Sequence, residues 1–287
     1  MDKGCLLCNF KAKNKAVKII KGCIFKKCPN CGLIYLDPQP DENVIEEFYP
    51  EQYFHSQHPA GYHDFIARKN DVMNYRLKAI VELVNNLNLD KGRLLEIGCA
   101  LGYLLELAQD SGWEAQGVEL SPWASDYARQ TTKVKVFTGK LEEANFQNDY
   151  FDAIVMIELI EHIPNPRAFL KEVYRILKPG GLIFITTPNS KSIHTKLWNK
   201  RFQEIYLIPE HLFSFSIPTI KRILELTDFK VVHLQTKTYL RRYYDYQIPL
   251  GLFRQIRGLG RRIMLRLFNN LNLGEMLVVG AKKEIKN

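Results

Sequence analysis

The sequence of 287 residues lacks any long hydrophobic run. Its apolar stretches fall well short of the ~18 consecutive residues that a membrane-spanning helix needs. Residues 1–5, MDKGC, contain no apolar core of the kind found in a secretory signal. We therefore expect neither a transmembrane helix nor secretion. The six cysteines are accordingly expected to be reduced thiols of a cytoplasmic protein rather than disulfides.

Acidic residues are the other shortage. The chain has 31 Asp and Glu against 40 Lys and Arg, which gives a net charge of +9. This balance favours anionic partners such as nucleic acid, phosphorylated lipids or nucleotide-linked substrates. The hydrophobic content of 46% supports a buried core, and the length suits one large domain with an appendage or two small domains.

The most informative stretch is 93–102, RLLEIGCALG, which is followed by a helical pattern. A short apolar run contains Glu96, and Gly98 and Gly102 follow it, so the stretch predicts a strand, a tight turn and a helix. Gly98 lets a ligand approach the backbone closely, and the helix start offers free N–H groups. A second acid, Glu119, ends another apolar run about 20 residues later, where nucleotide-binding α/β folds hold a ribose.

The turn does not match the G-x-G-x-x-G pattern of dinucleotide sites. Glu96 would repel a pyrophosphate and suits a cationic ligand. The alternative is that both glycines only allow the helix to pack closely on the strand. The motif and Glu119 resemble those of class I S-adenosylmethionine-dependent methyltransferases, over roughly residues 60–287. The resemblance implies cofactor contacts at Glu96, Gly98, Cys99, Gly102, Tyr103, Glu119, Leu120, Leu141, Ile157 and Glu158.

The same resemblance implies an α/β fold, a Rossmann-like sheet with helices on both faces. The alternation of apolar strands with helical patterns agrees, with strands predicted over 134–137, 151–157 and 182–186. A K-P-G-G segment at 178–181 ends a helix, and a last strand over 275–281 is expected to be antiparallel. The chain departs from the family at Lys140, where an acid usually binds adenine. The backbone of Leu141 or the side chain of Glu142 could replace that contact.

Two C-x-x-C pairs near the N-terminus predict a metal site formed by Cys5, Cys8, Cys28 and Cys31. The spacing is typical of a zinc ribbon, and four thiolates close the site, so the zinc would be structural. Cys23 is expected to be a packed thiol, with a ligand role as the lesser alternative. We predict a ribbon over 1–40 and a methyltransferase domain over 41–287, with substrate-side segments over 190–275. The ribbon either grips RNA or is a small domain that needs a metal to fold.

The segment E-L-I-E-H at 158–162 follows a predicted strand. His162 could be a general base; alternatively Glu158, Glu161, His162 and His211 could hold Mg²⁺ or Mn²⁺, or these residues only brace the loop. E-x-x-E-H resembles the metal site of small-RNA 2′-O-methyltransferases and quinone-pathway O-methyltransferases. His211 lies in P-E-H-L-F-S-F-S, similar to a segment of ribbon-bearing bacterial and archaeal methyltransferases of sugar, polysaccharide and antibiotic pathways. It is a second base or ligand candidate, or a packed histidine. The same resemblance places Tyr53 over the cofactor.

Residues 246–274 contain no acid and five arginines. Over 248–271 the apolar residues fall on one helical face and arginines fall opposite, although three glycines weaken the helix. Such a helix could contact an anionic membrane, or pack on its own domain with a solvated basic face. We expect a methyltransferase for a small or lipid-linked metabolite, such as a sugar, polysaccharide or isoprenoid intermediate. The rivals are an RNA methyltransferase and a non-catalytic cofactor- or nucleic-acid-binding module.

Overall fold

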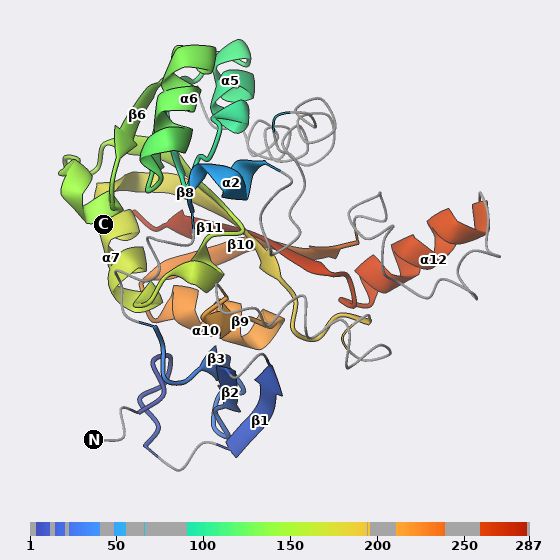
Figure 1. The fold of residues 1–287 in the computed structure, drawn as a ribbon. Helices are drawn as coiled ribbons and strands as arrows, with labels where there is room; N and C mark the ends of the chain where they lie inside the picture. Colours follow the sequence, from blue (N-terminus) through green and yellow to red (C-terminus); the bar gives the residue numbers. More distant parts are fainter. Residues whose placement is uncertain are drawn as a thin grey trace.

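The computed structural model describes residues 4–11, 15–20, 23–40, 49–55, 66, 91–193, 195, 211–238 and 259–285. These residues form a four-stranded sheet near the N-terminus and a seven-stranded sheet covered by helices (Figure 1). In this part of the chain no helix is long and apolar enough to cross a bilayer. The predicted helices around residues 43–49 and 77–84, and the aromatic segment 196–208, lie almost wholly or wholly outside the described residues.

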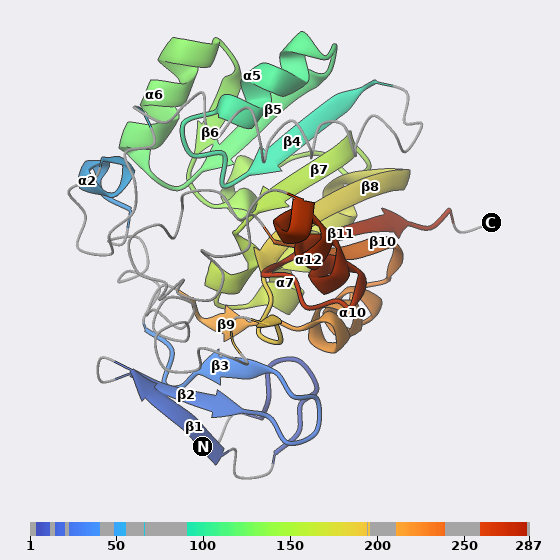
Figure 2. The ribbon, with the colours of Figure 1, turned by 90° about the vertical axis from the view of Figure 1, so that its right-hand side faces the viewer.

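The large sheet has the strand order β10-β11-β8-β7-β4-β5-β6 (Figure 2). Its parallel strands are β4 (Arg93–Ile97), β5 (Glu114–Glu119), β6 (Lys135–Thr138), β7 (Phe151–Ile157) and β8 (Leu177–Pro188). Strand β11 (Met276–Lys283) is antiparallel to β8 and to β10 (Phe229–Lys237), between which it lies. The predicted Rossmann-like sheet is therefore confirmed, including the antiparallel last strand.

Helices cover both faces of this sheet. They are α5 (Tyr103–Asp110), α6 (Pro122–Thr132), α7 (Pro166–Ile176) and α10 (Ile217–Glu225). Successive side chains of a strand point to opposite faces. Thus Ile154 and Met156 pack in one core with α7 and α10, whereas Ala153 and Val155 pack in the other with α5 and α6. Two hydrophobic cores enclose the sheet and fix the carboxyl ends of its parallel strands at one edge.

Local signals in the sequence set the helix starts. The Ser121 hydroxyl accepts a hydrogen bond from the Ala124 N–H, and Asn165 caps α7 through the Ala168 N–H at 3.2 Å. Each cap is followed by a proline in the first turn, where its missing N–H costs nothing. Helix α7 ends at Ile176, just before the K-P-G-G segment, but that segment already belongs to β8, so the strand starts earlier than predicted.

The small sheet joins the N-terminal strands to a later segment. Strands β1 (Lys15–Ile20), β2 (Cys23–Lys27) and β3 (Ile34–Leu36) are antiparallel, and β9 (Phe213–Ser214) pairs with β3. The Leu36 N–H also donates to the Leu212 carbonyl at 2.9 Å. Buried ribbon side chains share one core with the main domain. The domain boundary at residue 40 stays a prediction, but the ribbon is bonded directly to the segment that contains His211.

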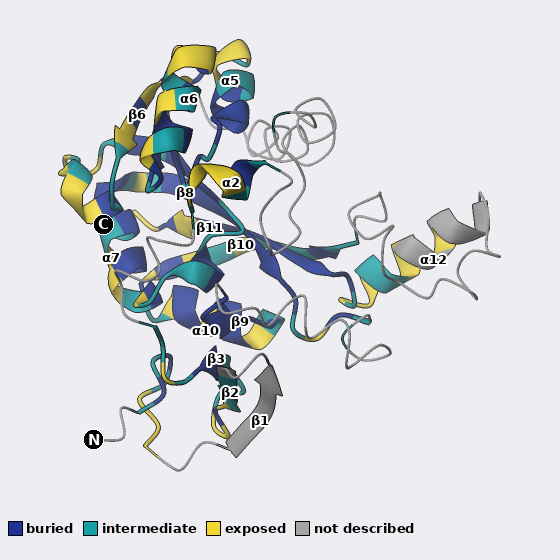
Figure 3. Ribbon diagram, viewed as in Figure 1, coloured by how far each residue is buried: buried dark blue, intermediate teal, exposed yellow. Residues whose placement is uncertain are grey.

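Helix α12 (Leu259–Asn270) extends away from the two sheets (Figure 1). Its C-terminal end is fixed to β10, because the Thr236 hydroxyl donates to the Asn269 carbonyl at 3.2 Å. Figure 3 shows exposed positions along the helix, and Ile263 and Leu267 are 50% and 53% exposed. At Ile263 and Leu267 this face is therefore exposed rather than packed on its own domain, and the hydrogen bond to β10 lies at the end of the helix. The choice between a membrane contact and a solvated face stays a prediction. Residues 248–258 lie outside the described part.

Candidate functional site

A cavity of about 690 Å³ opens at the carboxyl ends of β4, β5 and β7. The loop after β4, the end of β5, the turn after β7 and two short elements, α2 (Glu51–Phe54) and η2 (Leu141–Ala144), line it. Of the predicted cofactor residues, all but Gly102 lie in this lining: Glu96, Gly98, Cys99, Tyr103, Glu119, Leu120, Leu141, Ile157 and Glu158. The sequence therefore predicted residues that the fold brings to one cavity. Their contact with a cofactor stays a prediction.

The two glycines of the loop have different roles. Gly98 (φ 72°) lets the chain turn at the cavity, and its N–H and that of Cys99 donate to the Val118 carbonyl. Gly102 (φ 77°) begins α5, and a Cβ there would lie 3.0 Å from that of Ala128 on α6. Gly102 thus allows α5 to pack closely on α6, which is a helix–helix contact and not the helix–strand contact that the alternative interpretation of the motif named. Gly98 shapes the cavity wall.

The Glu119 carboxylate holds the loop in place. One of its oxygens accepts the Ala100 N–H at 2.8 Å and the other accepts the Ser121 N–H at 2.9 Å. Ala100 has a positive φ of 47°, which is unfavourable for a residue with a Cβ. Glu119 therefore fixes the strained turn between β4 and α5 and lies at the cavity wall.

Glu96 and Glu119 make the cavity suited to a cation. They are 4% and 7% exposed. Burial raises the pKa of both carboxyls, and the charge of Glu119 raises the pKa of Glu96 further. One Glu96 oxygen is buried without a hydrogen-bond partner in the described part of the chain. A positively charged ligand would offset the cost of burying the two carboxylate charges, and its hydroxyl groups could bond the Glu96 oxygen that lacks a partner among the described residues.

The segment that follows β6 forms the wall at the predicted adenine position. Lys140, Leu141 and Glu142 all line the cavity. The Lys140 N–H donates to the Glu143 carboxylate at 2.8 Å, which turns the chain into η2. Leu141 is buried, so its side chain forms an apolar surface there. Adenine recognition by the backbone of Leu141 or by Glu142 stays a prediction.

Aromatic side chains form another part of the cavity wall. Tyr49, Tyr53 and Phe54 line the cavity. The Phe54 ring stacks on Trp123 of α6 with 5.5 Å between centroids and 26° between planes. This contact anchors α2 against the cofactor half of the sheet. Tyr53 lines the cavity, and its role as a cofactor cover stays a prediction.

Three ionisable side chains meet beside the cavity. Ligand atoms of Glu161, His162 and His211 all lie within 4.8 Å of one another, and Glu158 is not part of this group. The His162 and His211 rings are 4.7 Å apart at 77°. His162 belongs to η3 (Ile160–His162) and lines the cavity, whereas His211 is 9% exposed and lies outside the lining. Of these three described side chains, His162 is the one that lines the cavity.

Tyr49 is a site residue that the sequence alone did not reveal. Its hydroxyl lies 3.0 Å from Nδ1 of His162. Its only signal in the sequence was a place near the aromatic segment before the sheet. A hydrogen bond to Nδ1 fixes the ring and leaves Nε2 for other partners.

Glu161 is the most deeply buried member of this group, at 1% exposure. Burial raises the pKa of its carboxyl to about 8, and the charge of Glu158 adds to the rise. Neither carboxylate oxygen has a partner within hydrogen-bond geometry among the described residues. One carboxyl and two imidazoles fit a divalent cation, and either a cation or a protonated His162 beside Glu161 would favour the ionised form of its carboxyl. Of the four predicted metal ligands, three lie together.

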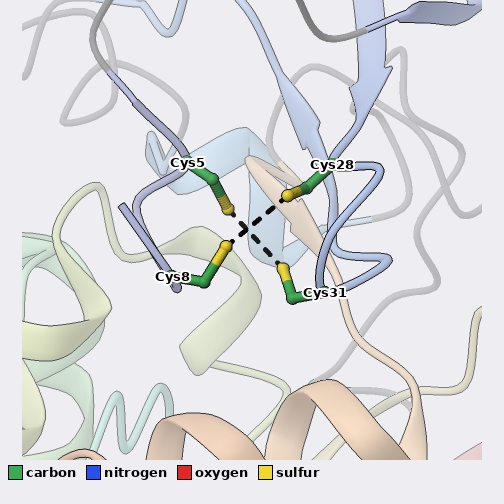
Figure 4. Close-up of side chains that lie close together, drawn as sticks. All are labelled: Cys5, Cys8, Cys28 and Cys31. Atoms are coloured by element: carbon green, nitrogen blue, oxygen red, sulfur yellow. Dashed lines mark hydrogen bonds between the residues drawn. The ribbon is translucent and has the colours of Figure 1, made fainter. Parts of the chain in front are cut away.

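The four predicted thiolates converge between the two ribbon loops (Figure 4). The Sγ atoms of Cys5 and Cys31 are 3.6 Å apart, as are those of Cys8 and Cys28, and none forms a disulfide. Tetrahedral zinc at about 2.3 Å from each sulfur requires about 3.8 Å between sulfurs. Without a cation, burial raises the pKa of the Cys5 thiol to about 11. The geometry and donors therefore fit a closed zinc site.

The sequence was also compared with known proteins. A family model described as "Methyltransferase domain" matches residues 70–234. A ubiquinone biosynthesis O-methyltransferase of Xanthomonas oryzae pv. oryzae is 33% identical over 109 residues, which are 36% of this chain and 46% of that protein. The Bordetella avium protein of the same name is 31% identical over 120 residues, which are 40% of this chain and 49% of that protein. The chain thus spans about half the length of the curated relatives it matches.

Solved structures share the fold. A chain from the complex of the Haloferax volcanii Trm112 methyltransferase activator with a methyltransferase has a TM-score of 0.56 at 18% identity, covering 77% of this chain and 95% of that one. An S-adenosylmethionine-dependent methyltransferase of Thermotoga maritima has a TM-score of 0.52 at 20% identity, covering 77% and 97%. At these identities the likeness shows the fold alone. Together with the matched family model, it shows that the chain belongs to the methyltransferase-domain family and has the class I S-adenosylmethionine-dependent fold.

Proposed function

We propose that the protein transfers a methyl group from S-adenosylmethionine to a hydroxyl of a small or lipid-linked acceptor, such as a sugar, polysaccharide or isoprenoid intermediate. The main support is the pair of buried acids, Glu96 and Glu119, at the glycine loop of a cavity that His162 also lines. The acids suit a cationic cofactor with a ribose, and the histidine suits a protic acceptor. The O-methyltransferase names of the relatives favour oxygen as the accepting atom.

The cofactor supplies a methyl group activated on a sulfonium. Glu119 would accept hydrogen bonds from the ribose while it holds the loop at Ala100, and Glu96 would offset positive charge. The aromatic wall would exclude water and orient the acceptor. Positioning of this kind supplies much of the barrier reduction in an in-line transfer.

His162 would take the acceptor proton. If its Nδ1–H donates to the Tyr49 oxygen, Nε2 is the nitrogen whose lone pair would accept that proton. Glu161, whose carboxylate lies within 4.8 Å of a His162 nitrogen, would stabilise the resulting imidazolium. His211 packs against the His162 ring and limits its rotation. The alternative mechanism places Mg²⁺ or Mn²⁺ on Glu161, His162 and His211, where it would polarise the acceptor oxygen.

We further propose that Cys5, Cys8, Cys28 and Cys31 bind one structural zinc. All four positions of a tetrahedral ion would be filled by protein, so no position is left for substrate.

The test supplies methyl-labelled cofactor and the full-length protein to fractionated lysate of the source organism. Label in a small polar or organic-phase product that is absent with His162→Gln supports the proposal. Nuclease-sensitive label would instead assign an RNA acceptor. Cofactor binding without label in any fraction would make the protein a binding module and contradict the proposed activity.

A further inference from the structure

Helix α12 and the turn after it present a run of exposed apolar side chains. Ile263, Leu267 and Leu271 are 50%, 53% and 64% exposed. They are spaced four residues apart, and the Leu271 N–H donates to the Leu267 carbonyl at 2.9 Å, so they lie along one side of the helix. The other exposed large apolar residues in the described chain are scattered singly: Phe10, Phe137, Val232 and Ile285. Single exposed residues are ordinary, but a row on a projecting helix indicates a contact surface.

The charge around this face identifies the kind of partner. Residues 246–274 contain five arginines and no acid. Arg266, within the helix, is exposed, as Ile263 and Leu267 are. A second copy of the chain would bring a second acid-free, arginine-rich segment against the first, which is unfavourable. An anionic lipid surface instead offers negative headgroups to the arginines and an acyl boundary to the apolar side chains.

The attachment of α12 places it on the side of the sheet where the cavity lies. The Ile193 N–H donates to the Leu273 carbonyl at 2.8 Å, and the Asn189 side chain donates to the Gly274 carbonyl at 2.8 Å. Residue 189 directly follows β8, so the base of α12 is bonded to the carboxyl edge of the sheet. The same edge holds the cavity with Glu96, Glu119 and His162.

We propose that α12 docks the protein on an anionic membrane surface through Ile263, Leu267 and Leu271. The helix lies in the headgroup region with Arg266 against the anionic lipids, and the carboxyl edge of the sheet lies close to the surface. The proposed docking is argued from the exposed apolar face and the charge of α12 alone. Its use for reaching a lipid-linked acceptor rests on the proposed function.

The test is flotation of the full chain with vesicles of phosphatidylglycerol and phosphatidylcholine, compared with vesicles of phosphatidylcholine alone, without cofactor or acceptor. We expect binding to the anionic vesicles only. Ile263→Gln with Leu267→Gln should reduce the partition coefficient by about tenfold or more, because two apolar side chains no longer enter the interface. Arg266→Glu and added salt should reduce it as well. Val232→Gln, at another exposed apolar residue, should bind like the wild type.

The altered side chains are exposed, so unchanged thermal unfolding would show that the variants fold. Calorimetry with S-adenosylmethionine on the same variants separates the two proposals, since lost vesicle binding with intact cofactor binding concerns α12 alone. Wild-type protein that does not float with anionic vesicles would overturn the docking, as would a double variant that floats as well as wild type. A third outcome would also overturn the docking: no vesicle binding, together with a dimer that light scattering detects in the wild type but not in the double variant. That outcome would assign the face to self-association.

Discussion

Loss of the ribbon metal should impair catalysis without abolishing cofactor binding. The perturbation is Cys31→Ser, which removes one of the four converging thiols. Zinc-site affinities of about 10–16 kcal/mol in small zinc domains match or exceed the stability of a typical domain. A ribbon without its metal should therefore unfold locally. Strand β3 would then no longer pair with β9, next to His211.

The size of the effect follows from the bonds that β3 makes. It pairs with Phe213 and Ser214, and Leu36 N–H donates to the Leu212 carbonyl. Two or three such hydrogen bonds, at about 1 kcal/mol each, are worth roughly 2–3 kcal/mol. Since every 1.4 kcal/mol is tenfold, local opening of residues 212–214 should become roughly 30- to 150-fold more frequent. His211 would then restrict the rotation of the His162 ring less effectively, and turnover should fall.

The assay combines amide hydrogen exchange over 211–216, zinc content, calorimetry with S-adenosylmethionine, and turnover. Exchange should rise and turnover fall, while cofactor affinity stays near wild type, because Glu96 and Glu119 lie on strands remote from the small sheet. The matched control is Phe10→Ser, an exposed residue of the ribbon beside the Cys5–Cys8 loop that is not one of the four thiols. It should retain zinc, protection and turnover.

Two outcomes would refute this reasoning. If zinc-free Cys31→Ser retained full turnover and full protection over 211–216, the β3–β9 pairing would not position His211. If it lost cofactor binding altogether, the ribbon and the methyltransferase domain would unfold as one unit, through the core that they share.

Further predictions concern the cavity. Glu119→Ala should weaken S-adenosylmethionine binding by about 1.5–3 kcal/mol, or about 10- to 150-fold in Kd. The control Glu114→Ala, at the exposed start of the same strand, should leave the affinity unchanged. Equal affinities of both variants by calorimetry would remove Glu119 from the site. The raised pKa of Glu96 and of Glu119 means that the empty folded cavity favours their protonated forms, so their contribution to stability is lost as pH rises above 4.5 through the raised values. A cationic cofactor should therefore release protons and bind more tightly as pH rises over that window; calorimetry in buffers of different ionisation enthalpy would contradict this by detecting no release. His162→Gln should bind cofactor normally and lose about 10²–10⁴-fold in turnover, and wild-type turnover would make His162 structural. If a metal acts instead, chelator should abolish activity, Mg²⁺ or Mn²⁺ alone should restore it, and Glu161→Gln should be as damaging as His162→Gln.

The sequence by itself determined the elements of the cofactor half. Strands of a parallel sheet are buried on both faces, so they are recognisable in the sequence as apolar runs. Ser121 and Asn165 indicate the helix starts, because a capping side chain accepts a hydrogen bond from an N–H group only two or three residues away. The turn at Gly98 and the acid at Glu119 were predictable because each lies at the end of a strand that is recognisable from its apolar run. The close C-x-x-C pairs likewise brought the four cysteines to one predicted site.

Only the tertiary structure decided which distant segments meet. Nothing in the spacing of residues 34–36 and 213–214 encodes their pairing, because the backbone groups at a strand edge accept any partner that the topology supplies. The contact of Tyr49 with His162, and of His162 with His211, depends on the same long-range arrangement. The apolar pattern around Ile263 predicted a helix face but not what covers it, since amphipathicity defines a surface and leaves its partner to the fold. The sequence therefore fixes local turns and caps through near neighbours, while the composition of the site depends on how the sheets are assembled.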